Sequence, residues 1–281
     1  MTLGNIFMKE KSMKYVNDHD YHIHSLYSPC GGDPLQTPER ILQYAKDYNL
    51  KQICLADHFW DEKVPHVAPD TSWGRWCKRQ DFQKISQALP LPSDDNIRFM
   101  FGCETDIDKL NRIGVSKERL DLFDFIVVST THLHMNHFTI DDGVTSLERR
   151  ADIFVEKFDA LLNMDLPFKK IGLAHITCGL VAVENTGYLK VFEMIKDETY
   201  QRLFSKAAEL GMGIELNLET RIKNPADRDC ILRPYFIAKA CGCKFYLGSD
   251  AHTTAELERA YERQSATIET FGLEESDKFI I

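Results

Sequence analysis

Histidine and carboxylate residues recur along the chain in short motifs of similar spacing. His22 and His24 are separated by one residue, and Asp250 and His252 repeat that spacing near the other end of the chain. Imidazole and carboxylate side chains are ligands for divalent ions such as zinc, manganese and iron. Further residues of these types, with one amide, are Asp57, His58, Glu104, His132, His134, His175, Glu215 and Asn217. Because one ion takes about four to six ligands, this number of donors indicates two or three ions.

Each of these motifs lies at or near the carboxyl end of a predicted strand. Short apolar runs, several of them continuous, alternate with amphipathic segments, which is typical of a buried parallel sheet. The predicted strands are Tyr21–His24, Gln52–Ala56, Arg98–Glu104, Phe125–Thr130, Lys170–His175, Gly213–Leu218 and Lys244–Gly248. Seven strands that alternate with helices predict a closed or nearly closed α/β barrel, with an open doubly wound sheet as the alternative. In a barrel the carboxyl ends of the strands converge on one mouth, where active sites lie.

The predicted helices have recognisable ends. Thr37 before Pro38 is typical of an N-terminal cap, and Ser146 is suited to the same role. Glycines 211, 242 and 272 are predicted to end helices. The predicted helices span residues 38–48, 147–163, 198–210, 227–241 and 254–271.

Residues 60–96 interrupt the alternation of strands and helices and carry four of the ten prolines. Long insertions of this kind in compact domains are commonly functional, and we predict that this one could form a lid. It contains Trp73, Arg75 and Trp76. Aromatic rings interleaved with cations could stack on a planar substrate, but we favour the interpretation that this stretch is a packed loop.

Length and composition predict a single soluble domain over residues 1–281. The net charge is −9 and the pI is about 5.6, which disfavours a nucleic-acid-binding protein. No apolar run is long enough to span a membrane. The N-terminal stretch lacks the apolar segment of a secretory signal, so we expect a cytoplasmic protein. The eight cysteines are scattered and are expected to be mostly reduced thiols.

Six of these motifs together resemble the PHP family (polymerase and histidinol phosphatase). They are HIH at 22–24, ADH at 56–58, GCE at 102–104, His132, AH at 174–175 and GSDAH at 248–252. They occur in the family's order between about residues 20 and 255. The resemblance implies a distorted seven-stranded (β/α) barrel similar to a TIM barrel, a centre of three metal ions and hydrolysis of a phosphoester.

The resemblance also implies how the ligands are shared among the ions. The ligands of the first ion would be His22, His24, Glu104 and Asp250. Glu104 would bridge to a second ion bound by His132 and His175, although His134 is a rival to His132. His58 and His252 would bind a third ion. Many relatives complete that third set with a histidine where this chain has Cys30, so Cys30 or Asp33 would complete it, or the third ion would be weakly bound.

The activity that follows is hydrolysis of a small phosphomonoester by a metal-activated hydroxide. Histidinol phosphate is the named candidate substrate. Glu104, Asp250 and His252 are the expected catalytic residues, and Arg221 is the expected phosphate-binding residue. Glu215 and Asn217 are expected to orient histidine ligands.

Other functions remain open. A broader phosphoesterase or nuclease acting on nucleotides would use the same ligands. A C–N-cleaving amidohydrolase would carry a lysine after the fourth strand, where this chain has TTHLH at 130–134. A non-catalytic, metal-bound PHP module is the remaining alternative. We expect a small phosphorylated substrate and no membrane partner, and the sequence predicts no oligomeric state.

Overall fold

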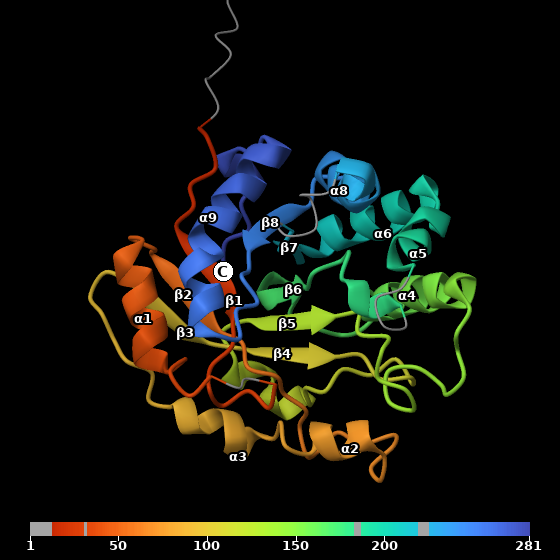
Figure 1. Ribbon diagram of the computed structural model, residues 1–281, viewed down its shortest axis with the longest axis horizontal. Helices are drawn as coiled ribbons and strands as arrows, with labels where there is room; N and C mark the ends of the chain where they lie inside the picture. Colours follow the sequence, from red (N-terminus) through yellow and green to blue (C-terminus); the bar gives the residue numbers. More distant parts are fainter. Residues whose placement is uncertain (1–12, 31–32, 183–186, 219–224) are drawn as a thin grey trace, which may run out of the picture.

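Two parallel sheets form the centre of the molecule in the computed structural model, which describes residues 13–30, 33–182, 187–218 and 225–281 (Figure 1). The first sheet has the order β1 (His19–Ile23), β2 (Gln52–Leu55) and β3 (Arg98–Phe101). The second has the order β4 (Cys103–Asp106), β5 (Ile126–Ser129), β6 (Ile171–Leu173), β7 (Gly213–Leu216) and β8 (Lys244–Leu247). Every neighbouring pair is parallel, so the α/β class is confirmed.

The expected single seven-stranded barrel is not what the described residues form, because the predicted strand Arg98–Glu104 is two strands, β3 and β4. The break lies at Gly102, whose N–H donates to the Leu55 carbonyl at 2.8 Å. The next residue, Cys103, donates instead to the Phe125 carbonyl at 3.2 Å. A Cβ atom at Gly102 would lie 2.4 Å from the Phe125 carbonyl oxygen, so only glycine permits this change of partner. The result is eight strands in two sheets.

The outer edges of the two sheets, β1 and β8, are joined by both side-chain and backbone hydrogen bonds. The backbone N–H of Leu247 donates to Nε2 of His19 at 3.1 Å, and that of Ser249 donates to Oδ1 of Asp20 at 2.9 Å. The His24 N–H donates to the Ala251 carbonyl at 3.1 Å. These bonds place the loop after β8 beside the carboxyl end of β1.

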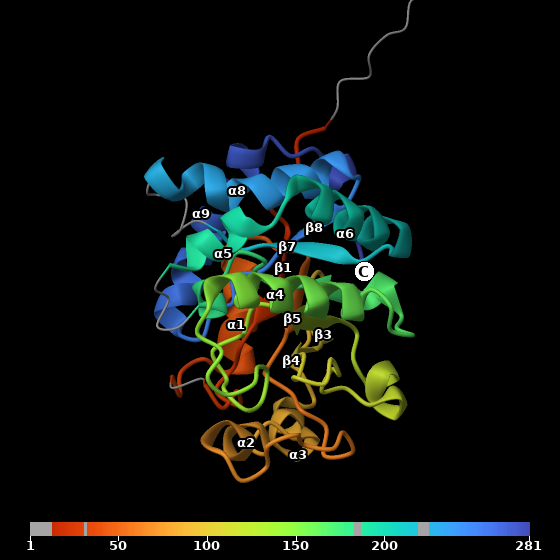
Figure 2. The ribbon, with the colours of Figure 1, turned by 90° about the vertical axis from the view of Figure 1, so that its right-hand side faces the viewer.

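The predicted helices are confirmed within one or two residues at most ends, and they lie outside the strands (Figures 1 and 2). Thr37 and Ser146 cap helices as predicted, and glycines 211, 242 and 272 follow helices with positive φ. The helices around the sheets are α1 (Pro38–Asp47), α4 (Leu147–Leu161), α5 (Tyr188–Met194), α6 (Asp197–Leu210), α8 (Pro225–Ala240) and α9 (Thr254–Phe271). Short 3₁₀ segments are η2 (Lys117–Leu122), η3 (Phe168–Lys170), η4 (Gly179–Val181) and η6 (Glu275–Asp277). None of the helices in the described part of the chain is long and apolar enough to cross a membrane.

The insertion at 60–96 folds into α2 (Ser72–Cys77), α3 (Phe82–Ile85) and η1 (Ser86–Ala88). Both views place α2 and α3 together at one end of the molecule (Figures 1 and 2). A small apolar cluster anchors the insertion to the segment after β5; its buried members are Trp60, Cys77, Met135 and Phe138. Trp73 and Trp76 pack against this cluster, as expected for a packed loop.

Candidate metal centre

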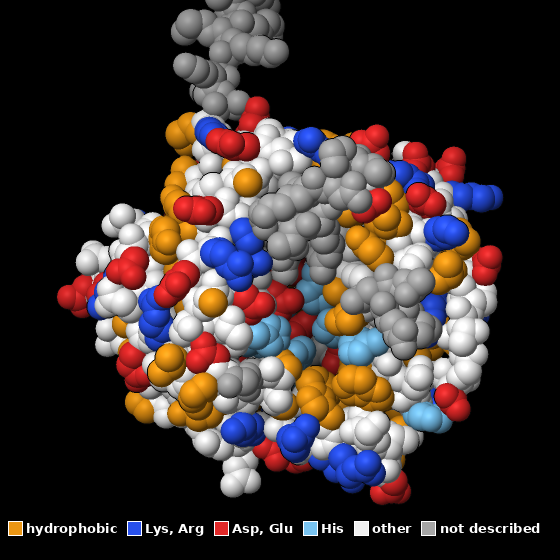
Figure 3. Space-filling view, in the orientation of Figure 1, with side chains coloured by type: hydrophobic (Ala, Val, Ile, Leu, Met, Phe, Trp, Pro, Cys, Tyr) orange, Lys and Arg blue, Asp and Glu red, His pale blue; other side chains and the backbone are white. Residues whose placement is uncertain are grey.

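The ends of the strands bring all nine predicted ligands together at the bottom of one hollow, where histidine and carboxylate side chains gather (Figure 3). They form three groups, and within each group the candidate ligand atoms lie within 4.8 Å of one another. The groups are His22, His24, Glu104 and Asp250; Glu104, His132 and His175; and His24, Cys30, His58 and His252. Adjacent groups share a residue, which is Glu104 in one case and His24 in the other.

Glu104 lies at the centre of the cluster and is 1% exposed. Its Oε2 atom lies 3.4 Å from Nε2 of His22, 3.3 Å from Nε2 of His24 and 3.1 Å from Nδ1 of His58. Its Oε1 atom lies 3.2 Å from Nε2 of His175. Burial raises the pKa of this carboxyl, but the surrounding imidazoles, His58 first, hold it well below its usual range. Glu104 is therefore an anion.

Several buried polar atoms in the cluster have no hydrogen-bond partner among the described residues. They are Oε2 of Glu104, Oδ1 of Asp250 and Nδ1 of His58. Leaving such atoms unpaired costs about 1–3 kcal/mol each. Anionic oxygens and imidazole nitrogens that face one another without hydrogen bonds are the donor set that a divalent ion satisfies. The residues present therefore fit bound metal ions.

Glu215 orients two of the imidazole-bearing residues from β7. Nδ1 of His22 lies 2.6 Å from Oε1 of Glu215, which leaves Nε2 of His22 facing Glu104. The other carboxylate oxygen of Glu215 accepts the backbone N–H of His175 at 2.6 Å. A carboxylate that fixes the far ring nitrogen is the usual partner of a metal-ligating histidine. Asn217, predicted to share this role, lines a separate small hollow beside Ser249.

Sequence reasoning missed Asp106, which orients His132. Nδ1 of His132 lies 2.8 Å from Oδ1 of Asp106, and both side chains are buried. A usable signal was present, because residues two apart on a strand share a face and Asp106 follows Glu104 by two on β4.

Of the two rivals on the segment after β5, only His132 joins a ligand group. His134 packs edge-on against Trp73, with ring centroids 5.0 Å apart. Burial, helped by the charges of His132 and Arg150, lowers the pKa of His134 to about 3. His134 is therefore a neutral wall residue in this structure.

Cys30 and Asp33, the two candidates to complete the third set of ligands, also differ in their positions. Sγ of Cys30 belongs to the group of His24, His58 and His252, and lies 3.2 Å from Oγ of Ser28. Asp33 belongs to no group, since its Oδ2 atom accepts both the N–H and the hydroxyl of Thr254, at 2.8 and 2.7 Å. Cys30 is exposed as a residue, but desolvation of its thiol within the site raises the pKa of that thiol, and the carboxylates of Glu104 and Asp250 add to this. Without an ion the sulfur keeps its proton.

Two further carboxylates near the cluster serve the backbone. Asp57, in the ADH motif after β2, accepts the N–H and hydroxyl of Ser25 at 2.6 and 2.7 Å and so fixes the loop after β1. Asp20 accepts the N–H of Ser249 beside Asp250, and burial raises the pKa of Asp20 to about 6. Asp250 itself has a left-handed φ of 53°, a conformation that non-glycine residues adopt mainly at constrained sites.

A cavity of about 310 Å³ opens onto the three groups. Its wall away from the candidate ligands consists of Trp73, Trp76, His134, Met135 and Leu180. Trp73 and Trp76 of the insertion therefore line the cavity as well as packing against the apolar cluster. Arg221, the expected phosphate-binding residue, lies outside the described residues.

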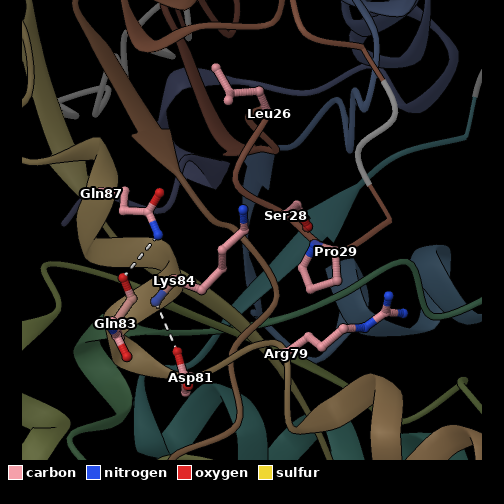
Figure 4. A pocket seen from close by; sticks show the side chains of 8 residues that line it. All are labelled: Leu26, Ser28, Pro29, Arg79, Asp81, Gln83, Lys84 and Gln87. Atoms are coloured by element: carbon pink, nitrogen blue, oxygen red, sulfur yellow. Dashed lines mark hydrogen bonds between the residues drawn. The ribbon is translucent and has the colours of Figure 1, made fainter.

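A second hollow, of about 520 Å³, lies beside the loop after β1 (Figure 4). Ser28 and Pro29 line it, together with Arg79 and Lys84 from the insertion. In the close-up, Lys84 extends toward Leu26 and Ser28, whereas Arg79 extends beneath Pro29. No residue of this hollow lines the cavity over the candidate ligands.

Comparison with known proteins decides the family. The model of the PHP domain matches residues 20–219, which is more than half of the chain. The chain belongs to the PHP domain family. None of the curated proteins compared with it matches its sequence.

Solved structures from two bacteria are among those that share the fold of this PHP protein. One is histidinol phosphate phosphatase from Lactococcus lactis, solved with zinc, L-histidinol and phosphate. It is 18% identical, with a TM-score of 0.60 over 94% of this chain and 99% of that one. The other is a candidate histidinol phosphatase from Listeria monocytogenes, 15% identical, with a TM-score of 0.61 over 87% of this chain and 98% of that one. At these identities the likeness concerns the fold.

Proposed function

We propose that this PHP protein binds two or three divalent ions and hydrolyses a small phosphomonoester. The observation that carries the proposal is the arrangement of nine candidate ligands in three groups that share Glu104 and His24. Shared residues place neighbouring ions close together, and paired ions are a recurrent solution for phosphoester hydrolysis.

We assign the ligands by group. His22, His24, Glu104 and Asp250 would hold one ion, and Glu104 would be shared with a second ion held by His132 and His175. His58, His252 and Cys30 would hold a third ion beside His24. Bound divalent ions supply charge to neutralise phosphate oxygens and lower the pKa of water toward neutrality.

The chain itself orients and insulates the reacting groups. Glu215, Asp106 and the hydroxyl of Thr131, which lies 3.1 Å from Nδ1 of His175, fix the rings of three histidines. Fixed rings would hold the bound ions in place, and the ions would in turn hold the substrate phosphate in one position. This lowers the entropic cost of attack on the phosphate. Glu104 is ionised and buried, so water does not screen its negative charge.

Asp250 and His252 are our candidates for exchanging protons with the substrate. Their side chains are 27% exposed, whereas those of His22, His24 and Glu104 are at most 1% exposed. Both line the cavity that a substrate would enter. We propose further that Arg221 binds the phosphate, since it follows the β7 strand by five residues in sequence.

The choice of ester to test first comes from the fold neighbour. The Lactococcus lactis structure contains zinc, L-histidinol and phosphate, so zinc and histidinol phosphate are the first ion and the first ester to use. The acidic net charge of −9 does not favour a nucleic-acid substrate.

The experiment is a count of bound metal joined to an activity panel. The purified chain, supplemented with zinc, manganese or iron, is analysed for metal content and assayed on histidinol phosphate, glycerol phosphate and nucleoside monophosphates. We expect at least two ions per chain and release of inorganic phosphate that a chelator abolishes. Bound metal with no release from any ester would favour a non-catalytic module, and less than one ion per chain would refute the proposal.

A further inference from the structure

The described wall of the cavity over the candidate ligands, outside the ligand groups, contains no lysine, arginine, aspartate or glutamate. Apart from the three ligand groups, that wall is Trp73, Trp76, His134, Met135 and Leu180. The only carboxylates among the lining residues are Glu104 and Asp250, both members of ligand groups. A cationic group on the substrate would find no described carboxylate free to pair with it.

The two tryptophans are held in place rather than lying loosely on the surface. Trp76 meets His58 edge-on, with ring centroids 5.3 Å apart, and Trp73 meets both His134 and Trp76 edge-on. Met135 is 1% exposed beneath them. Edge-on aromatic packing is a stable arrangement, and it leaves ring surface available to the cavity.

The cations of the insertion lie elsewhere. Arg79 and Lys84 line the second hollow and not the cavity over the candidate ligands (Figure 4). Arg75, between the two tryptophans in sequence, is exposed and donates to the Asp70 carbonyl. The described side chains over the candidate ligand groups are therefore mainly apolar and aromatic, with no lysine or arginine among them.

We propose that the leaving group of the substrate is an uncharged, aromatic or apolar alcohol that packs against Trp73 and Trp76. This inference rests on the proposed phosphatase function and narrows its substrate class. An ammonium group buried against this wall would lose its hydration without an ion-pair partner among the described residues, so we expect amine-bearing esters, histidinol phosphate included, to be poorer substrates than uncharged ones. A small polar alcohol would gain no apolar contact.

Three esters test the proposal on the metal-loaded protein. 3-Phenylpropyl phosphate and phenylalaninol phosphate share one carbon skeleton and differ by an ammonium group, and glycerol phosphate lacks the ring. We expect kcat/KM for 3-phenylpropyl phosphate to exceed that for each of the others by about tenfold or more. Phenylalaninol phosphate hydrolysed as well as 3-phenylpropyl phosphate would overturn the inference while leaving the phosphatase function intact.

Substitutions of Trp73 and Trp76 test whether these residues determine the preference for an apolar ester. Trp73→Ala and Trp76→Ala should each reduce the ratio of kcat/KM for 3-phenylpropyl phosphate to that for glycerol phosphate by about tenfold, mainly through KM. Trp73→Phe and Trp76→Phe should restore most of the ratio, and they serve if the alanine variants do not fold. Arg75→Ala, in the same helix, should leave the ratio unchanged. Equal ratios in all these variants would overturn the assignment of the wall.

A binding measurement separates this inference from the proposed function. If no ester is hydrolysed, the proposed function fails. Quenching of tryptophan fluorescence by the same esters then decides the inference. Tighter binding of 3-phenylpropyl phosphate than of phenylalaninol phosphate supports the apolar site, and equal or reversed affinities overturn it.

Discussion

Nδ1 of His132 lies 2.8 Å from Oδ1 of Asp106, with both side chains buried. The carboxylate fixes the ring so that its other nitrogen is free for an ion, and it makes that nitrogen a stronger donor. His132 is one of three ligands in its group, beside Glu104 and His175. The site of the second proposed ion therefore depends on Asp106, which belongs to no ligand group itself.

Replacing Asp106 by asparagine should weaken this ion's site without unfolding the protein. We expect a loss of about 10–100-fold in metal affinity or in phosphatase activity, because the ring loses its anionic partner. Competition with a chelating dye measures the affinity. Asp141→Asn, which removes an exposed carboxylate paired with Lys109, is the control and should change neither quantity. Unchanged affinity in Asp106→Asn would contradict the orienting role.

Cys30 should decide the third ion. We expect Cys30→Ser to lose about one metal equivalent per chain and Cys30→His to retain it, because histidine is a good ligand for zinc and serine is not. Elemental analysis gives the counts. Absorption of the cobalt-substituted protein gives a second readout, since a thiolate–metal band should vanish in both variants. Equal counts and an unchanged spectrum in all three proteins would exclude Cys30 as a ligand.

The metal-free protein should lose stability as the pH rises from about 6.5 to 9. Burial lowers the pKa of His24, but the carboxylates of Asp250 and Glu104 outweigh it and raise that pKa to about 9. A folded-state pKa above the unfolded value of about 6.5 stabilises the fold below pH 6.5, and that contribution disappears as the pH passes through 9.

The measurement is the Tm of chelated protein across that range. Wild type should lose more Tm between pH 6.5 and 9 than His24→Gln, which lacks the titrating ring. Bound zinc requires a neutral imidazole and should remove the difference. A pH dependence shared equally by wild type and His24→Gln would show that another group is responsible.

Arg150 should be a major stabilising residue although it pairs with no described carboxylate. It is 1% exposed and donates to the carbonyls of Leu133 at 2.7 Å and Val181 at 3.0 Å, besides that of Val144. Arg150→Met leaves these carbonyls unpaired and should cost about 2–4 kcal/mol of unfolding free energy. Urea unfolding measures it, with exposed Arg149→Met as the neighbouring control. Equal losses in the two variants would contradict this account.

The grouping of the candidate ligands was predictable because such residues recur at strand ends, and strand ends are readable from apolar runs. The spacing of His22 and His24 places both rings on one face, and the structure has both of them in one group. Helix ends were predictable for the same local reason, since Thr37, Ser146 and the three glycines act on their own helices.

Other features depend on contacts between distant segments. The strand break at Gly102 reflects its close approach to Phe125, which no local pattern marks. The exclusion of Asp33 follows from its bonds to Thr254, 221 residues away in sequence. The sequence could not show whether Trp73 and Trp76 line the cavity or pack within the insertion, because they do both.

Metal content of Glu104→Gln, measured by elemental analysis beside wild type, tests the central claim most directly. Glu104 is one of the two residues that belong to two ligand groups, so its neutral variant should weaken two ions at once. We predict two or three ions per wild-type chain, at most one in Glu104→Gln at the same free metal, and a loss of activity of at least about 100-fold. Equal metal content in the two proteins, with near-normal turnover in Glu104→Gln, would contradict the shared centre.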